Sequence, residues 1–221
     1  MIQYVADTDF PIVITTEDVS LDGLLHVPRQ AVGLVLFAHG SGSSRLSPRN
    51  QFIAHVMQKH HFATLLFDLL TPEEDVVDET TLSYRFDIEL LARRLKAATD
   101  WAIDNAILHK LPIGYFGAST GGGAALLAAA QPHAVAKAIV SRGGRPDLAG
   151  RHALVLVDAP TLLIVGGNDE PVIELNQSAY DQLNCEKEMA IVPGASHLFE
   201  ETGKLEEVAR LAVEWFEKYL K

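Results

Sequence analysis

A serine stands in a glycine-rich corner, Gly117-x-Ser119-x-Gly121, between an apolar run and an alanine-rich run. Residues 111–116 are typical of a buried strand, and residues 124–130 favour a helix. A strand, a Gly-x-Ser-x-Gly corner and a helix together predict a nucleophile elbow, in which the serine Oγ projects above the edge of a sheet. Glycines flank the serine because side chains there would collide as the backbone doubles back. We therefore predict that Ser119 is a catalytic nucleophile.

A serine hydroxyl needs a histidine to take its proton, and the histidine needs a carboxylate to hold its tautomer. His197 follows a late strand-like run in a Pro-Gly loop, whereas the other histidines apart from His39, seven in number, stand where no catalytic role is apparent. Asp169 directly follows another strand-like run, although Glu170 or Asp147 could supply the carboxylate instead. The sequence predicts a triad of Ser119, His197 as base and Asp169 as the residue that orients it.

The negative charge that develops during acyl transfer needs backbone N–H donors. The N–H of Thr120, at the start of the helix after the serine, is one predicted donor. The second is expected in residues 39–42, the loop after the first buried strand. We predict the N–H of Ser41, with that of Gly42 as the alternative. His39 is expected to bond within its loop and not to act as a second base.

Two arginines stand where they could reach the same pocket. Arg45 follows the predicted oxyanion loop, and Arg142 follows the strand after the elbow. A guanidinium grips carboxylate or phosphate in two places, so both residues are predicted to bind an anionic substrate. An arginine at a strand end can equally bond loop carbonyls or pair with an acid. The acidic chain opposes long-range attraction of anions, but screening leaves short-range contacts.

The elements that must position these residues alternate between strand-like and helix-like runs, which predicts a parallel sheet covered on both faces. Two short strands at 12–16 and 21–27 are expected to form an antiparallel edge. Further strands are predicted at 31–38, 62–67, 111–116, 135–141, 161–165 and 188–192. Helices are predicted at 48–60, 84–107, 124–130, 148–155, 172–183 and 205–220. The acidic residues 69–83 predict a solvated loop.

Length and composition limit the class of protein. A chain of 221 residues favours one domain, 1–221, and 48% hydrophobic with 21% charged residues is typical of globular proteins. The formal net charge of −11 argues against nucleic-acid or anionic-membrane partners. No apolar run is long enough to span a bilayer, and residues 1–10 lack the features of a signal peptide. The single cysteine, Cys185, fits a reducing compartment, so a cytoplasmic protein is expected.

Together these motifs resemble the α/β-hydrolase superfamily, and in particular the small serine esterases related to dienelactone hydrolase. The likeness covers about residues 32–220 and is carried by His39-Gly40, Gly117-x-Ser119-x-Gly121, Gly167-Asn168-Asp169 and Gly194-Ala195-Ser196-His197. It implies an α/β-hydrolase fold with a mostly parallel, doubly wound sheet, and the triad order serine, aspartate, histidine. It also implies hydrolysis of a small-molecule ester through an acyl-enzyme, without cofactor.

The chain departs from the larger members and from the type enzyme of this family in two respects. Residues 142–160 are too few for a lid domain, so an open site without a lid is expected. Dienelactone hydrolase proper uses a cysteine where this chain has Ser119, so dienelactone itself is not the expected substrate.

Two other functions stay open at this point. Gly40-x-Gly42 and Asp68 imitate a dinucleotide-binding unit of an oxidoreductase, but Arg45 stands where that fingerprint needs a third glycine. A hydrolase-fold binding protein without activity would carry the same motifs as an enzyme. No metal site is predicted, since the adjacent His60 and His61 point in different directions. A monomer and a homodimer are equally compatible with the sequence.

Overall fold

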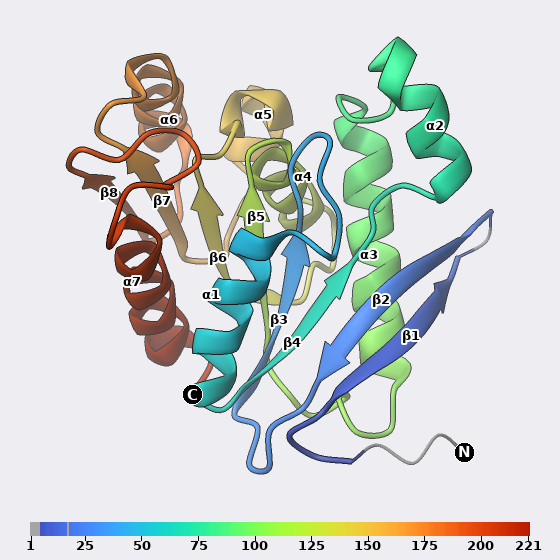
Figure 1. Ribbon diagram of the computed structural model, residues 1–221. Helices are drawn as coiled ribbons and strands as arrows, with labels where there is room; N and C mark the ends of the chain where they lie inside the picture. Colours follow the sequence, from blue (N-terminus) through green and yellow to red (C-terminus); the bar gives the residue numbers. More distant parts are fainter. Residues whose placement is uncertain (1–4, 17) are drawn as a thin grey trace.

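A single sheet runs through the centre of the molecule and has eight strands within residues 5–16 and 18–221, which are those that this computed structural model describes (Figure 1). The strand order is β1-β2-β4-β3-β5-β6-β7-β8. The strands are β1 (Asp9–Thr15), β2 (Ser20–His26), β3 (Gly33–Ala38), β4 (Phe62–Phe67), β5 (Ile113–Ala118), β6 (Ala136–Arg142), β7 (Thr161–Gly166) and β8 (Lys187–Val192). β2 pairs antiparallel with β1 and β4, and all other pairs are parallel. The predicted mostly parallel sheet with an antiparallel edge is confirmed.

Helices cover both faces of this sheet. They are α1 (Pro48–Lys59), α2 (Pro72–Thr81), α3 (Ile88–Asp104), α4 (Thr120–Ala129), the 3₁₀ helix η1 (Pro146–Ala149), α5 (Gly150–Leu154), α6 (Glu170–Gln182) and α7 (Lys204–Tyr219). Helices α1 and α7 pack on one face, and α3, α4 and α6 pack on the other (Figure 1). Strands β3, β4, β5 and β7 are buried throughout, as expected for strands covered on both sides.

Apolar packing fixes the strands whose ends carry the predicted site. On the α1/α7 side, Ile53 and Phe216 belong to one buried cluster with Phe37 of β3 and Phe116 of β5. The rings of Phe37 and Phe116 pack with their centroids 5.0 Å apart. Each side chain of this size contributes about 1.5–3 kcal/mol when buried. Strands β3 and β5 lead into the predicted oxyanion loop and the elbow. Both strands are therefore held in place by a well-packed core.

The prediction of a solvated loop at residues 69–83 is wrong, because most of this segment forms helix α2. Thr71 caps the helix, its hydroxyl accepting from the N–H of Glu74, while the Glu74 carboxylate accepts from the N–H of Thr71. Pro72 occupies the first turn together with three acidic residues. Acidic side chains there complement the positive end of the helix dipole. The acidic run that suggests a solvated loop is therefore what starts the helix.

The polarity of α2 is inverted relative to an ordinary surface helix. Asp78 is only 1% exposed, whereas Val76 and Val77 are 68% and 46% exposed. Within the described residues, α2 does not pack extensively against any other helix or strand. Figure 1 shows it standing at the margin of the molecule, beyond the end of α3. Charged contacts, not an apolar face, thus attach this helix to the molecule.

Other differences from the predicted elements are smaller. The helix predicted from residue 84 begins at Ile88, because Asp87 caps it by accepting from the N–H of Leu90. The helix predicted at 148–155 is divided into η1 and α5. Between β6 and β7 the chain forms only these two short helices, so the fold has no lid domain, as predicted. Across the described residues, no helix combines the length and the apolar character that crossing a bilayer requires.

Candidate active site

Ser119 occupies a sharp corner between β5 and α4. Its φ of 51° lies in the left-handed region, which strains a residue with a side chain. The corner is held by main-chain hydrogen bonds: the N–H of Ser119 donates to Arg142 at 3.2 Å, and its carbonyl accepts from Gly122 and Arg145. A Cβ atom on Gly117 would lie 2.5 Å from the carbonyl oxygen of Gly121, so the tight turn requires glycine. The structure thus has the elbow geometry that the sequence predicts.

Asp169 and His197 meet above the ends of two neighbouring strands. Asp169 follows β7, His197 follows β8, and His197 Nδ1 lies 2.7 Å from Asp169 Oδ2. Because an ionised carboxylate can only accept, Nδ1 carries the proton of this bond, and Nε2 takes no part in it. Gly166 allows the two loops to approach, since a Cβ there would lie 2.5 Å from the carbonyls of Ala195 and Ser196.

The same histidine lies next to the elbow. A Cβ atom on Gly143 would be 3.5 Å from His197 Cε1, and Gly143 directly follows Arg142, whose carbonyl accepts from the N–H of Ser119. Neither alternative carboxylate has a corresponding bond to the histidine among the described residues. Asp147 forms a two-pronged ion pair with Arg145 at 2.7 and 2.8 Å.

The predicted oxyanion loop lies against the elbow. A Cβ on Gly40 would lie 3.0 Å from Ser119 Cβ, and Ser41 Oγ is 3.3 Å from Thr120 Oγ1. Thr120 is the first residue of α4, so its N–H is one of the donors that the helix leaves free. Ser41 and Thr120, the two predicted donors, therefore stand side by side next to the serine.

His39, directly before this loop, is buried with a single defined tautomer. Its Nδ1 lies 3.0 Å from the carbonyl oxygen of Gly40, which is the bond within the loop that the sequence predicts. Its Nε2 lies 2.9 Å from the backbone N of Leu69. An N–H can only donate, so Nε2 must be unprotonated and the proton must be on Nδ1. Burial lowers the pKa of His39, which favours this neutral form.

The two arginines predicted to bind an anion differ in their partners. Arg45 pairs with Asp68, to which its backbone N–H also donates, and with Asp22 at 3.2 Å. Arg142 is only 6% exposed, and its Nε and Nη1 have no hydrogen-bond partner within the described chain. Its guanidinium carbon lies 5.8 Å from the ring centroid of Phe199. Burial, and then Arg49, lower the pKa of Arg142 to about 10.

Arg85 is a third arginine near the predicted site, and sequence reasoning misses it. Its Nη1 would lie 3.4 Å from a Cβ on Gly42, and it lines a small cleft with the oxyanion loop and Thr120. The buried Asp78 holds it, accepting from Arg85 Nε and from the backbone N–H groups of Tyr84 and Arg85. The only signal in the sequence is an aspartate seven residues before an arginine, within a segment that resembles a solvated loop.

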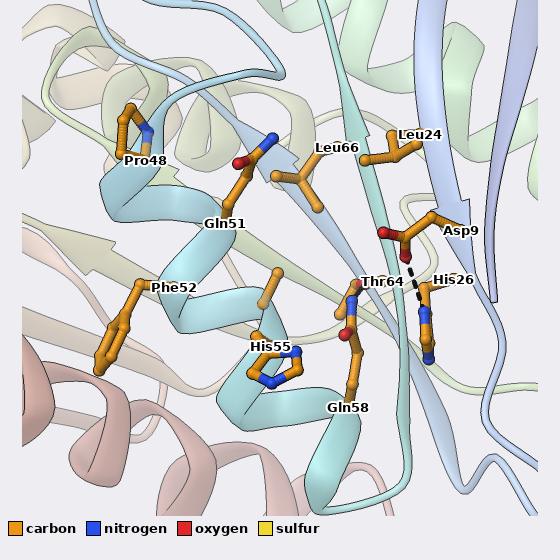
Figure 2. Close-up of a pocket in the computed structure, with 11 residues that line it drawn as sticks. Asp9, Leu24, His26, Pro48, Gln51, Phe52, His55, Gln58, Thr64 and Leu66 are labelled. Carbon is orange, nitrogen blue, oxygen red and sulfur yellow. Dashed lines mark hydrogen bonds and ion pairs between the residues drawn. The ribbon is translucent and has the colours of Figure 1, made fainter. Parts of the chain in front are cut away.

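A separate groove of about 450 Å³ lies between α1 and strands β2 and β4 (Figure 2). Asp9 and His26 pair at 2.7 Å on its sheet side, facing Gln51 and His55 of α1. None of the predicted catalytic, oxyanion or arginine residues lines it. Within the described residues, no three histidine, cysteine or acidic side chains are arranged to hold a metal ion.

Two curated relatives come from Mycobacterium tuberculosis, strains CDC 1551 and H37Rv, and both are named "Putative phosphoribosyl transferase". Each is 54% identical over 212 residues, which is 96% of this chain and 47% of the relative. The chain therefore spans about half the length of these relatives. No family model matches the chain.

Solved structures extend the comparison. Est1E from Butyrivibrio proteoclasticus has a TM-score of 0.78 at 16% identity, over 94% of this chain and 98% of that one. An α/β serine hydrolase without lid from Xanthomonas campestris has a TM-score of 0.78 at 18% identity, covering 99% and 98% of the two chains. These two share the fold. Dienelactone hydrolase from Anabaena variabilis ATCC 29413 is 56% identical over 97% of this chain and 99% of that one, with a TM-score of 0.94. The chain belongs to the dienelactone hydrolase family and has the α/β-hydrolase fold.

Proposed function

We propose that this hydrolase is a serine esterase that cleaves an ester-like carbonyl substrate through an acyl-enzyme. The observation that carries the proposal is the 2.7 Å bond between His197 Nδ1 and Asp169 Oδ2, beside the strained elbow of Ser119. A histidine oriented by a carboxylate next to an elbow serine is the arrangement that activates a hydroxyl nucleophile.

The reaction follows from these groups. Ser119 Oγ attacks the carbonyl carbon while His197 Nε2 takes the hydroxyl proton, and Asp169 stabilises the imidazolium. The N–H groups of Ser41 and Thr120 donate to the oxyanion of the tetrahedral intermediate. Its collapse breaks the bond to the leaving alcohol, which receives the proton from His197. Water, deprotonated by the same histidine, then attacks the acyl-enzyme. Collapse of the second tetrahedral intermediate releases the acid, and His197 returns the proton to Ser119 Oγ.

The substrate is proposed to be anionic, with its negative group bound by arginine. Of the two arginines predicted for this role, Arg142 is the better candidate because two of its nitrogens lack partners, whereas Arg45 is engaged by Asp22 and Asp68. A buried guanidinium with two unpartnered nitrogens is unfavourable, and a bound carboxylate would relieve it. Arg85 offers a second cation beside the oxyanion loop.

A fluorophosphonate probe tests the nucleophile directly. The probe should modify the protein once, with the adduct mapping to Ser119, and Ser119→Ala should prevent labelling. A panel of p-nitrophenyl esters with neutral and carboxylate-bearing acyl groups then tests the substrate class. Modification of another serine would overturn the assignment of Ser119, and a wild-type protein that neither reacts nor hydrolyses any ester would indicate an inactive binding protein.

The longer relatives are named "Putative phosphoribosyl transferase", so this activity should be tested in the same experiment. A phosphoribosyl transferase would release pyrophosphate from phosphoribosyl pyrophosphate in the presence of an acceptor, a reaction in which an acylated serine has no part. Pyrophosphate release that persists in Ser119→Ala would assign that activity to this chain in place of the esterase.

A further inference from the structure

Helix α2 is joined to the interior by a buried arginine of α3. Glu74 forms a two-pronged ion pair with Arg94, at 2.5 Å to Nη1 and 2.6 Å to Nη2. The Arg94 side chain is 7% exposed, so this pair is shielded from solvent more than an ordinary surface pair. Arg94 Nη1 also donates to the carbonyl oxygen of Leu69 at 2.6 Å. The arginine therefore links α2 to the segment that follows β4.

Leu69 continues the connection toward the site. Its N–H donates to His39 Nε2 at 2.9 Å, and His39 Nδ1–H donates to the carbonyl of Gly40 at 3.0 Å. We call the series Glu74, Arg94, Leu69, His39 and Gly40 the relay. Leu69, His39 and Arg94 are all buried, so water does not compete for these bonds.

The last bond of the relay helps to fix the direction of one peptide group, because the Gly40 carbonyl accepts from His39 at 3.0 Å and from the N–H of Ser43 at 3.2 Å. The described residues contain no cis peptide bond, so the Gly40 carbonyl and the Ser41 N–H point in opposite directions. Because that carbonyl points toward His39, the Ser41 N–H points away from it. Ser41 also lies beside Thr120, with 3.3 Å between their hydroxyl oxygens. A peptide held in this way presents its N–H without any reorganisation during the reaction.

We propose that Arg94 and His39 are positioning residues, and that the relay sets the orientation of the Ser41 N–H from helix α2. The proposal rests on the proposed function, because it assigns to Ser41 the second oxyanion donor. Arg94 and Glu74 do not contact substrate and act only through the peptide that His39 holds. Disturbing the α2 end of the relay should therefore lower kcat and leave KM largely unchanged.

Arg94→Met tests the relay, because it removes the donors and keeps most of the apolar stem. Arg93→Met is the matched control, since Arg93 is the exposed neighbour on the same helix. For an ester substrate, kcat should fall at least tenfold in Arg94→Met with KM within about twofold, and Arg93→Met should match wild type. The loss is a part of the roughly 10²–10³-fold that removal of a whole oxyanion donor causes. Glu74→Gln keeps the helix cap and removes the charge, so it provides a milder variant if Arg94→Met does not fold.

A second readout does not depend on activity. The amide resonance of Ser41 should shift in Arg94→Met or Glu74→Gln and stay in place in Arg93→Met. A variant that melts at a lower temperature but keeps its kcat and its Ser41 resonance would reduce the relay to a purely structural role and overturn the proposal. The Ser41 resonance could shift as expected while Ser119 of the wild-type protein does not react with the fluorophosphonate. That result would overturn the proposed function and leave the relay in place.

Discussion

The carbonyl oxygen of Ala38 occupies the place that a side chain on Gly121 would need. Ala38 ends β3 and Gly121 lies in the first turn of α4, so their contact brings the oxyanion loop against the elbow. Gly121→Ala forces the two backbones apart and should destabilise the protein by about 3 kcal/mol or more, measured by urea unfolding. Gly203→Ala is the control, because a Cβ there meets nothing within 4 Å and adds only left-handed strain of about 1–2 kcal/mol. Equal losses in the two variants would contradict the close approach.

Asp169→Asn should lower kcat by roughly 10⁴-fold while the protein keeps its fold, because an amide favours the wrong histidine tautomer. Asp147→Asn, which breaks only the pair with Arg145, should retain activity within about tenfold. Initial rates with one p-nitrophenyl ester suffice for the comparison. A large loss in Asp147→Asn with little change in Asp169→Asn would reverse the assignment of the carboxylate.

Ser41→Ala and Ser41→Pro separate the backbone of Ser41 from its side chain. The proposed donor is the main-chain N–H, so Ser41→Ala should stay within about tenfold of wild type. Ser41→Pro deletes the N–H and should raise the activation free energy by roughly 2.7–4 kcal/mol. Steady-state kinetics after a circular dichroism check of the fold gives the answer. Full activity in a folded Ser41→Pro protein would transfer the role to Gly42.

His39 should make stability depend on pH. Its pKa is lowered in the folded protein, chiefly by burial, whereas Gly40, Asp68 and Asp75 act in the opposite direction. The unfolded chain therefore takes up a proton first, and stability that is complete above pH 6.5 should decline as the pH falls below that value. Urea unfolding between pH 5.5 and 7.5 should show this slope in wild type and a shallower one in His39→Asn. An identical slope in both proteins would mean that other groups cause it.

Arg142→Ala should raise KM for a carboxylate-bearing ester far more than for its neutral analogue, if Arg142 binds the anionic group of the substrate. Arg45→Ala should affect the two substrates equally, because its guanidinium is already paired with Asp22 and Asp68. The measurement is KM for both esters in both variants. A change in Arg142→Ala that is the same for both esters would return Arg142 to a structural role.

Local patterns in the sequence are sufficient to predict the elbow. The features that such patterns miss depend on contacts between residues that are far apart in the chain. Ser119 can be identified because the strand, the glycines and the helix that define its corner are adjacent in the chain. Asp169 and His197 can be identified because residues after parallel strands gather at one edge of the sheet. By contrast, Arg85 is recognisable only from its contact with Gly42, and the exclusive pairing of Arg45 depends on strands β2 and β4 meeting in the fold. Helix α2 is missed because its polarity is inverted, so that its acidic residues suggest solvent exposure.

That inversion gives α2 an unusual response to the surrounding medium. Alcohols lower the dielectric constant of water and solvate apolar side chains better than water does, which weakens a hydrophobic core. The same change strengthens the attraction of Glu74 to Arg94 and of Asp78 to Arg85. It also improves the solvation of the outward-facing Val76 and Val77. In mixed aqueous–organic solvents, the attachment of α2 should therefore outlast the packing of the sheet that it borders.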